Sequence, residues 1–130
     1  MNAAEVARLF YESFSNGKMA ESLSTLVDTE AVLENPLPGP IPFGGRFEGR
    51  EGFAAYLQAI PAAIDIEQFD VDDILSEGDR VVVLGRETSR VLSTDKRYTM
   101  SWVHVLKVHD GRIQHFREYS DTAGMLAAFS

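Results

Sequence analysis

The chain has 130 residues, of which 45% are hydrophobic and 25% are charged, and its formal net charge is -8. This length and balance fit one globular domain, residues 1–130, with a core of its own. The acidic charge argues against binding to nucleic acid or to an anionic membrane, because both require a basic face.

Several residue types and patterns are missing, and their absence excludes further classes of site. The chain has no cysteine, which excludes disulfides, thiol catalysis and cysteine-bound metal. The histidines form no HxH or HExxH motif, so we expect no metal site, and no motif requires a cofactor. Charged residues interrupt the first twenty positions, and no apolar run reaches membrane length. We therefore expect a cytoplasmic protein.

The first half of the chain has helical spacing around one irregular stretch. Asn2 can cap a helix over 3–15 that carries Phe10 on its apolar stripe. A short second helix over about 19–27 and an extended piece over 31–34 follow. Residues 35–47 hold four prolines and predict a surface loop, either a rim over a pocket or a loop folded onto the core. A third helix then carries Tyr56 on its buried side.

The second half has the two-residue period of strands. Segments 66–76, 80–92, 97–109 and 112–120 read as strands, and tight turns connect them in direct succession. Residues 121–129 suit a short closing helix. We predict an α+β fold in which a curved antiparallel sheet wraps around the N-terminal helices, cone-shaped and with an internal pocket.

Short motifs occur in a characteristic order along nearly the whole chain. They are Glu34-Asn35-Pro36, Gly49-Arg50-Glu51, the hairpin of 103–106 with 110–113, and the ending Arg117-Glu118-Tyr119-Ser120-Asp121. Together with the order of elements, they resemble the nuclear-transport-factor-2-like superfamily, which includes ketosteroid isomerases and SnoaL-like polyketide cyclases. This fold hosts enzymes, receptors and dimerisation modules, so the resemblance predicts structure more strongly than function.

The residues that ketosteroid isomerases use are changed here. The resemblance places the general base of that family at Asn35, and an amide cannot accept a proton as a base. It places the tyrosine of the oxyanion hole at Phe10 and the aspartate at His104. We therefore expect no ketosteroid isomerisation by that mechanism.

Alternation along 97–109 puts Met100, Trp102 and His104 on one bulky face, which we place inward. His104 is either a core histidine with a backbone partner or a group that acts on a ligand. If Ser93 to Lys96 form a four-residue loop, Glu87 lies opposite Trp102.

The turn after residue 109 decides which residues of the last strand join His104. With a two-residue turn, His104 shares its face with His115, Arg117 and Asp121. With a three-residue loop over 109–111, Val108 pairs with Arg112, and His104 shares its face with Phe116 and Glu118. We favour the second register, because Phe116 makes the better core residue. Glu118 then lies about one diagonal from His104, and we expect the two to be electrostatically coupled.

These observations predict a domain that binds a small apolar molecule and transfers protons on a carbonyl compound, as an isomerase or cyclase does. The predicted catalytic residues are His104, Glu118 and Asp121; an aspartate near this last position is the acid and base of SnoaL-like cyclases by resemblance, although Asp121 can also cap a helix. The predicted ligand-binding residues are Phe10, Asn35, Tyr56, Met100, Trp102 and Phe116.

Two alternatives stay open. The first is a binding or dimerisation module without catalysis. The second is an epoxide hydrolase-like enzyme, for which Asp121, Arg86 and Glu87 would supply the carboxylates and the arginine. We also expect a homodimer through the convex face of the sheet, with Val81, Val83, Val103 and Val105 at the contact.

Overall fold

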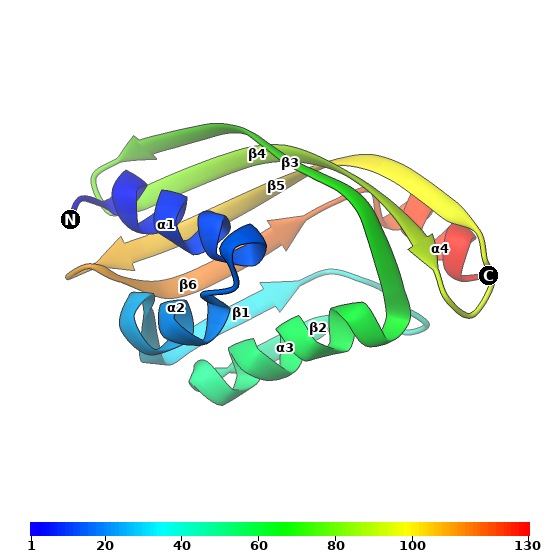
Figure 1. The fold of residues 1–130 in the computed structure, drawn as a ribbon, viewed down its shortest axis with the longest axis horizontal. Coiled ribbons are helices and arrows are strands. Elements are labelled where there is room, and N and C mark those ends of the chain that lie inside the picture. Colours follow the sequence, from blue (N-terminus) through cyan, green and yellow to red (C-terminus); the bar gives the residue numbers. More distant parts are fainter.

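The structure, a computed structural model, describes all residues 1–130 as four helices and one six-stranded sheet (Figure 1). The helices are α1 (Ala3–Asn16), α2 (Met19–Leu26), α3 (Gly49–Ala63) and α4 (Thr122–Phe129). The strands are β1 (Val27–Asn35), β2 (Gly45–Glu48), β3 (Ile64–Glu77), β4 (Arg80–Val91), β5 (Arg97–His109) and β6 (Arg112–Tyr119). The predicted α+β fold is confirmed.

The sheet is mixed rather than antiparallel throughout. Its strand order is β2-β1-β6-β5-β4-β3, and β3 to β6 form the predicted antiparallel meander. The difference is β1, which lies parallel to β6. A second difference is β2, a short edge strand within the proline-rich stretch, whose Gly45 pairs with Asn35 at the end of β1. The loop prediction is therefore right for 36–44 and wrong for the last residues of the stretch.

The proline-rich loop folds onto the core. Leu37, Ile41 and Phe43 are all buried. Asn35 holds the loop in place: its side-chain amide donates to the carbonyl of Phe43, and its oxygen accepts from the backbone N–H groups of Leu37 and Gly45.

The β5–β6 hairpin has a two-residue turn followed by a bulge. Asp110 and Gly111 both have positive φ, 51° and 75°, as a type I′ turn requires, and His109 pairs with Arg112. The predicted three-residue loop is therefore wrong. The register then shifts by one residue at Gln114, so that Lys107 lies opposite His115. This bulge, and not the turn, brings Phe116 and Glu118 to the inner face.

The inner face of the sheet carries most of the core. The even positions of β5 and the odd positions of β4 are buried there. Val81 and Val83 are fully buried in this core, so the prediction that they lie on the convex face is wrong; Val103 and Val105 do lie on that face. The odd positions of β4 face the core. The sequence pattern did not show which of its two faces lies inward, because valines occur on both.

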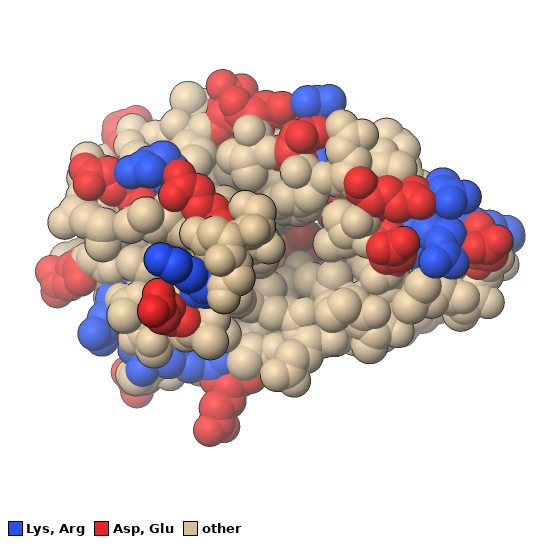
Figure 2. Space-filling view, in the orientation of Figure 1, with Lys and Arg blue, Asp and Glu red and all other residues tan.

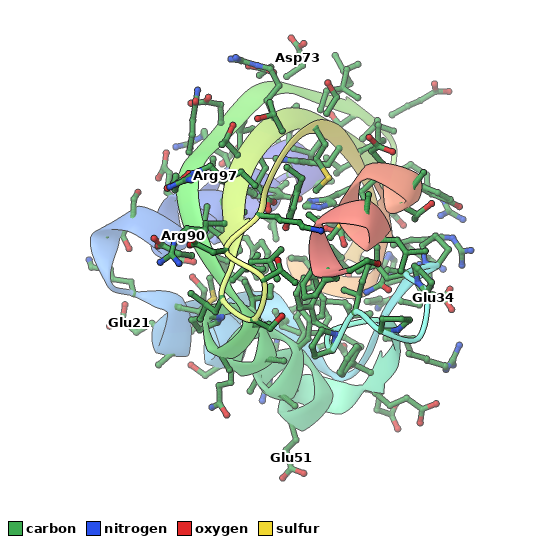
Figure 3. All side chains as sticks on the ribbon, turned by 90° about the vertical axis from the view of Figure 1, so that its right-hand side faces the viewer. Glu21, Glu34, Glu51, Asp73, Arg90 and Arg97 are labelled. Carbon is green, nitrogen blue, oxygen red and sulfur yellow. The ribbon has the colours of Figure 1, made fainter.

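The helices cover the concave side of the sheet. Figure 1 shows α1 over the middle strands, α3 below them and α4 at the far end, and Figure 3 shows the sheet as an arch with Arg90, Arg97 and Asp73 on its outer side. Asn2 caps α1 by accepting from Glu5 N–H, and Gly17, with a φ of 76°, ends it. None of the helices is long and apolar enough to cross a membrane.

Candidate active site

A cavity of about 1030 Å³ lies between the helices and the concave face of the sheet. Its volume is at the upper end of the range for small-molecule sites, roughly 300–1,000 Å³. Of its 32 lining residues 21 are hydrophobic, so it suits a largely apolar molecule. Figure 2 shows its opening as a hollow in the middle of the molecule, with mostly uncharged walls and an acidic residue at depth.

Three buried polar side chains from three different elements form a continuous chain at the cavity wall. The Tyr11 hydroxyl of α1 lies 2.7 Å from Nδ1 of His104 on β5. Nε2 of the same imidazole lies 3.0 Å from Oε2 of Glu118 on β6. All three residues line the cavity and are less than a tenth exposed. The register explains the second contact, because Glu118 lies directly opposite His104 rather than one diagonal away.

The partners of the imidazole determine where its proton lies. An ionised Glu118 can only accept, so Nε2 carries the hydrogen and Nδ1 accepts from the Tyr11 hydroxyl. Burial, with the nearby charge of Glu118, holds the pKa of Tyr11 well above its usual value. Tyr11 therefore stays a neutral phenol that donates a hydrogen bond.

Tyr56 of α3 extends this chain toward a second carboxylate. Its hydroxyl donates to Oε1 of Glu118 at 3.4 Å. Burial raises the pKa of Tyr56 well above its usual value, and the charges of Glu118 and then Glu87 add to the effect. Tyr56 is therefore a neutral phenol within the electrostatic reach of both carboxylates.

Glu87 of β4 forms the second polar group of the cavity. Its Oε2 accepts from the Ser89 hydroxyl at 2.7 Å and from the Tyr98 hydroxyl at 2.9 Å. Burial raises the pKa of Glu87, the two hydrogen bonds oppose that rise, and the charge of Glu118 adds to it. Glu87 lies opposite Met100, and not opposite Trp102 as the four-residue loop predicted, because the β4–β5 connection is longer than that.

Four of the six predicted ligand-binding residues line the cavity: Phe10, Tyr56, Met100 and Phe116. Asn35 does not line the cavity, because it holds the proline-rich loop. Trp102 is buried behind the wall and stacks on the His104 ring, with ring centroids 4.1 Å apart, and on Phe69. It therefore fixes the plane of the imidazole, and its own Nε1–H has no partner.

Of the three predicted catalytic residues, two contact each other and the third lies outside the cavity. His104 and Glu118 meet in the cavity. Asp121 is exposed, does not line the cavity, and caps α4 by accepting from Gly124 N–H at 3.0 Å. Helix capping is what brings an aspartate to this position.

The set expected for an epoxide hydrolase is not assembled. Arg86 lies on the outer face of the sheet, where its guanidinium forms two hydrogen bonds to Asp72. Glu87 points into the cavity and Asp121 caps α4. Neighbouring positions on a strand face opposite sides, which separates Arg86 from Glu87.

Tyr11 and Tyr98 are site residues that the sequence did not single out, and Glu87 was considered only through a loop length that proved wrong and as part of the epoxide hydrolase set. Tyr11 lies one helical turn after the buried Ala7, so a wider apolar stripe on α1 would have included it. Tyr98 is on the inward face already assigned to β5. Glu87 follows Val81 and Val83 at even spacing, and recognising that those valines are core would have placed it inward. No group of three or more His, Cys, Asp or Glu side chains is arranged to hold a metal ion.

Comparison with known proteins places the chain among relatives of this fold. Residues 7–116 match the family model of the SnoaL-like domain. The uncharacterized protein YesE of Bacillus subtilis strain 168 is 27% identical over 129 residues, which cover 98% of this chain and 86% of YesE.

Solved structures match the fold of this chain over nearly its full length. An NTF2-like protein from Burkholderia xenovorans LB400 matches with a TM-score of 0.88 and 23% identity, covering 100% of this chain and 98% of that one. A Bacillus subtilis protein provisionally named an isomerase matches with a TM-score of 0.78 and 26% identity, covering 98% and 91%. The chain therefore belongs to the SnoaL-like domain family, and it shares its fold with NTF2-like proteins.

Proposed function

We propose that the protein is an acid–base enzyme of the isomerase or cyclase type, which moves a proton on the carbon next to a carbonyl group of a small, largely apolar compound. The observation that carries this proposal is the Tyr11–His104–Glu118 chain facing an apolar cavity. A relative provisionally named an isomerase is consistent with it.

The hydrogen-bonded series Tyr11–His104–Glu118 couples a base to a hydrogen-bond donor. In the resting state the Tyr11 hydroxyl donates to His104 and is not free to donate elsewhere. When the Tyr11 hydrogen turns from Nδ1 of His104 to the carbonyl oxygen of the substrate, the Nδ1 lone pair becomes free to take a proton from the substrate carbon. The imidazolium that forms donates through Nε2 to the Glu118 carboxylate, whose charge stabilises it. Tyr11 thus stabilises the negatively charged oxygen of the substrate while His104 holds the proton.

The apolar walls of the cavity strengthen both the ion pair of His104 with Glu118 and the hydrogen bond to the substrate oxygen. Phe10, Phe53 and Phe116 surround the polar chain, and these aromatic rings keep the local dielectric low. A charge that forms on the substrate there gains more from one donor than it would in water.

Exchange of carbon-bound hydrogen tests this function without knowledge of the natural substrate. The probe is 2-tetralone, a small apolar ketone, in deuterated water, with loss of the signal of its C1 hydrogens followed by proton NMR. We expect the protein to accelerate the exchange above the buffer rate. Glu118→Gln removes the charge that stabilises the imidazolium of His104 and should slow the catalysed exchange by about 100-fold or more, and Tyr11→Phe removes the donor and should slow it by a similar factor.

A matched control separates the site from the rest of the surface. Asp121→Ala removes a carboxylate close in sequence but outside the cavity, so its exchange rate should equal that of the unmodified protein after correction for the folded fraction. Binding of 2-tetralone without any acceleration would contradict the proposal and favour the binding module. A loss of exchange in Asp121→Ala would show that this residue, and not the His104–Glu118 pair alone, takes part in the proton transfer.

A further inference from the structure

Glu87 has a carboxylate oxygen that the protein leaves free at the cavity. Both hydroxyl groups that contact this residue, those of Ser89 and Tyr98, donate to Oε2, and no protein group donates to Oε1. The residue is nevertheless buried, with only 8% of its surface exposed, and it lines the cavity. A buried carboxylate is stabilised when its oxygens accept hydrogen bonds, so the second oxygen is suited to a donor supplied by a ligand.

The position of Glu87 along the sheet sets it apart from the catalytic chain. Glu87 lies opposite Met100, whereas Glu118 lies opposite His104, four residues farther along β5. At about 3.3 Å per residue these two levels are about 13 Å apart at the backbone. The side chains extend from a concave surface into one cavity, and Tyr56 is within the electrostatic reach of both carboxylates. The two polar groups are therefore the two ends of one binding site.

The cavity that contains both ends is mostly apolar. Leu33, Phe43, Met100 and Met125 are among the apolar side chains that line it. A ligand that fills it gains from burying an apolar body there, and it needs polar groups only at its ends.

The geometry points to a second polar subsite, made of Glu87, Ser89 and Tyr98, in which Oε1 of Glu87 accepts a hydrogen bond from a hydroxyl group of the ligand. The natural ligand is then a compact ring compound with a carbonyl at the Tyr11–His104–Glu118 end and a hydroxyl group at the other. Only the assignment of the carbonyl end rests on the proposed function; the hydroxyl end rests on the free oxygen of Glu87.

Ser89 and Tyr98 position the carboxylate for this role. Ser89 is fully buried and Tyr98 is nearly so. Because both donate to the same oxygen, they orient the carboxylate plane and leave Oε1 directed away from them. They are positioning residues, whereas Glu87 contacts the ligand.

The test compares three ketones that differ only on the ring remote from the carbonyl. These are 2-tetralone, 6-hydroxy-2-tetralone and 6-methoxy-2-tetralone, with each Kd measured by isothermal titration calorimetry on the unmodified protein. A hydrogen bond to a buried carboxylate contributes about 1.5 kcal/mol or more, which corresponds to about tenfold tighter binding of the hydroxy ketone. The methoxy ketone cannot donate, so it should bind no more tightly than 2-tetralone. Equal Kd values for the hydroxy and methoxy ketones would overturn the proposal.

A variant then assigns the preference to Glu87. In Glu87→Met, which keeps a similar volume without an acceptor, the preference for the hydroxy ketone should disappear; a preference that persists would overturn the assignment. The control is Glu12→Met, which removes an exposed carboxylate at the cavity rim and should retain the preference. If Glu87→Met does not fold, the comparison of the hydroxy and methoxy ketones on the unmodified protein still decides the matter.

The two proposals can fail separately. Glu118→Gln should lose hydrogen exchange and keep the preference for the hydroxyl group, because that preference depends on Glu87. A protein that shows the preference without catalysing exchange would sustain the subsite and refute the proposed function. A protein that catalyses exchange without the preference would refute the subsite and sustain the proposed function.

Discussion

Two glutamates share the cavity in different surroundings. Glu118 contacts an imidazole, which can take up or give a proton, and it accepts a further hydrogen bond from Tyr56. Glu87 accepts hydrogen bonds only from hydroxyl groups, which do not ionise near neutral pH. This difference supports our proposal that the His104–Glu118 pair transfers the proton and that Glu87 recognises the ligand.

Stability should depend on pH through Glu87. Burial raises the pKa of its carboxyl above the usual 4.5, so the folded state retains a proton that the unfolded chain has already lost. The resulting contribution to stability is complete below the unfolded pKa and is lost as the pH rises through the higher, folded pKa. Relative to Glu87→Gln, the unfolding free energy of the unmodified protein should therefore fall as the pH rises from about 4 to 7.

Urea unfolding at a series of pH values measures this difference. Gln keeps the oxygen to which Ser89 and Tyr98 donate, so the variant changes the charge and retains those contacts. Glu51→Gln, which alters an exposed carboxylate of α3, corrects for the general effect of net charge. A difference between Glu87→Gln and the unmodified protein that stays constant with pH would show that Glu87 keeps the same ionisation in both states.

At the scale of the elements, β4 and β5 pack most closely where Gly85 meets Trp102. Gly85 lies opposite Trp102, and a Cβ at Gly85 would overlap the indole ring and the carbonyl oxygen of Asp70. The ring stacks in turn on His104, so the absence of a side chain at Gly85 helps to hold the imidazole in place.

Gly85→Ala should therefore destabilise the protein by about 1–3 kcal/mol or more, as overpacked cores do. Urea unfolding followed by the fluorescence of Trp102, the one tryptophan of the chain, measures the loss and reports on the ring itself. Gly39→Ala is the matched control, because nothing lies within 4 Å of a Cβ built there. If Gly85→Ala unfolds at the same urea concentration as the control, the sheet adjusts to the methyl group at no cost.

The alternation of residues could predict elements, but it could not predict contacts that depend on one inserted residue. The inward face of β5 follows from its two-residue period alone, and so His104 could be placed correctly. The bulge at Gln114 has no such signal, although it decides that Glu118 and not Arg117 lies opposite His104. The parallel pairing of β1 with β6 joins segments about 80 residues apart and is equally invisible to local pattern.

On the scale of the whole molecule, the outer face of the sheet carries an apolar patch. Val82 lies opposite Val105, Leu84 lies opposite Val103, and all four are partly exposed. Tyr119, which is 44% exposed, continues the patch onto β6 opposite Val103. A patch of this kind favours association, because covering it removes apolar surface from water.

We predict that this patch, defined by Val82, Leu84, Val103, Val105 and Tyr119, forms the contact of a homodimer. A two-fold contact uses the same surface on both copies, so one substitution places two charges in it. Val103→Glu should therefore convert the dimer to a monomer in analytical ultracentrifugation at micromolar concentration, because its cross-strand neighbours Leu84 and Tyr119 supply no positive charge to the buried carboxylates. Ser24→Glu adds the same charge on the exposed side of α2 and should leave the dimer intact. An unmodified protein that sediments as a monomer would contradict the prediction, and the patch would then be an exposed sheet face with no role in assembly.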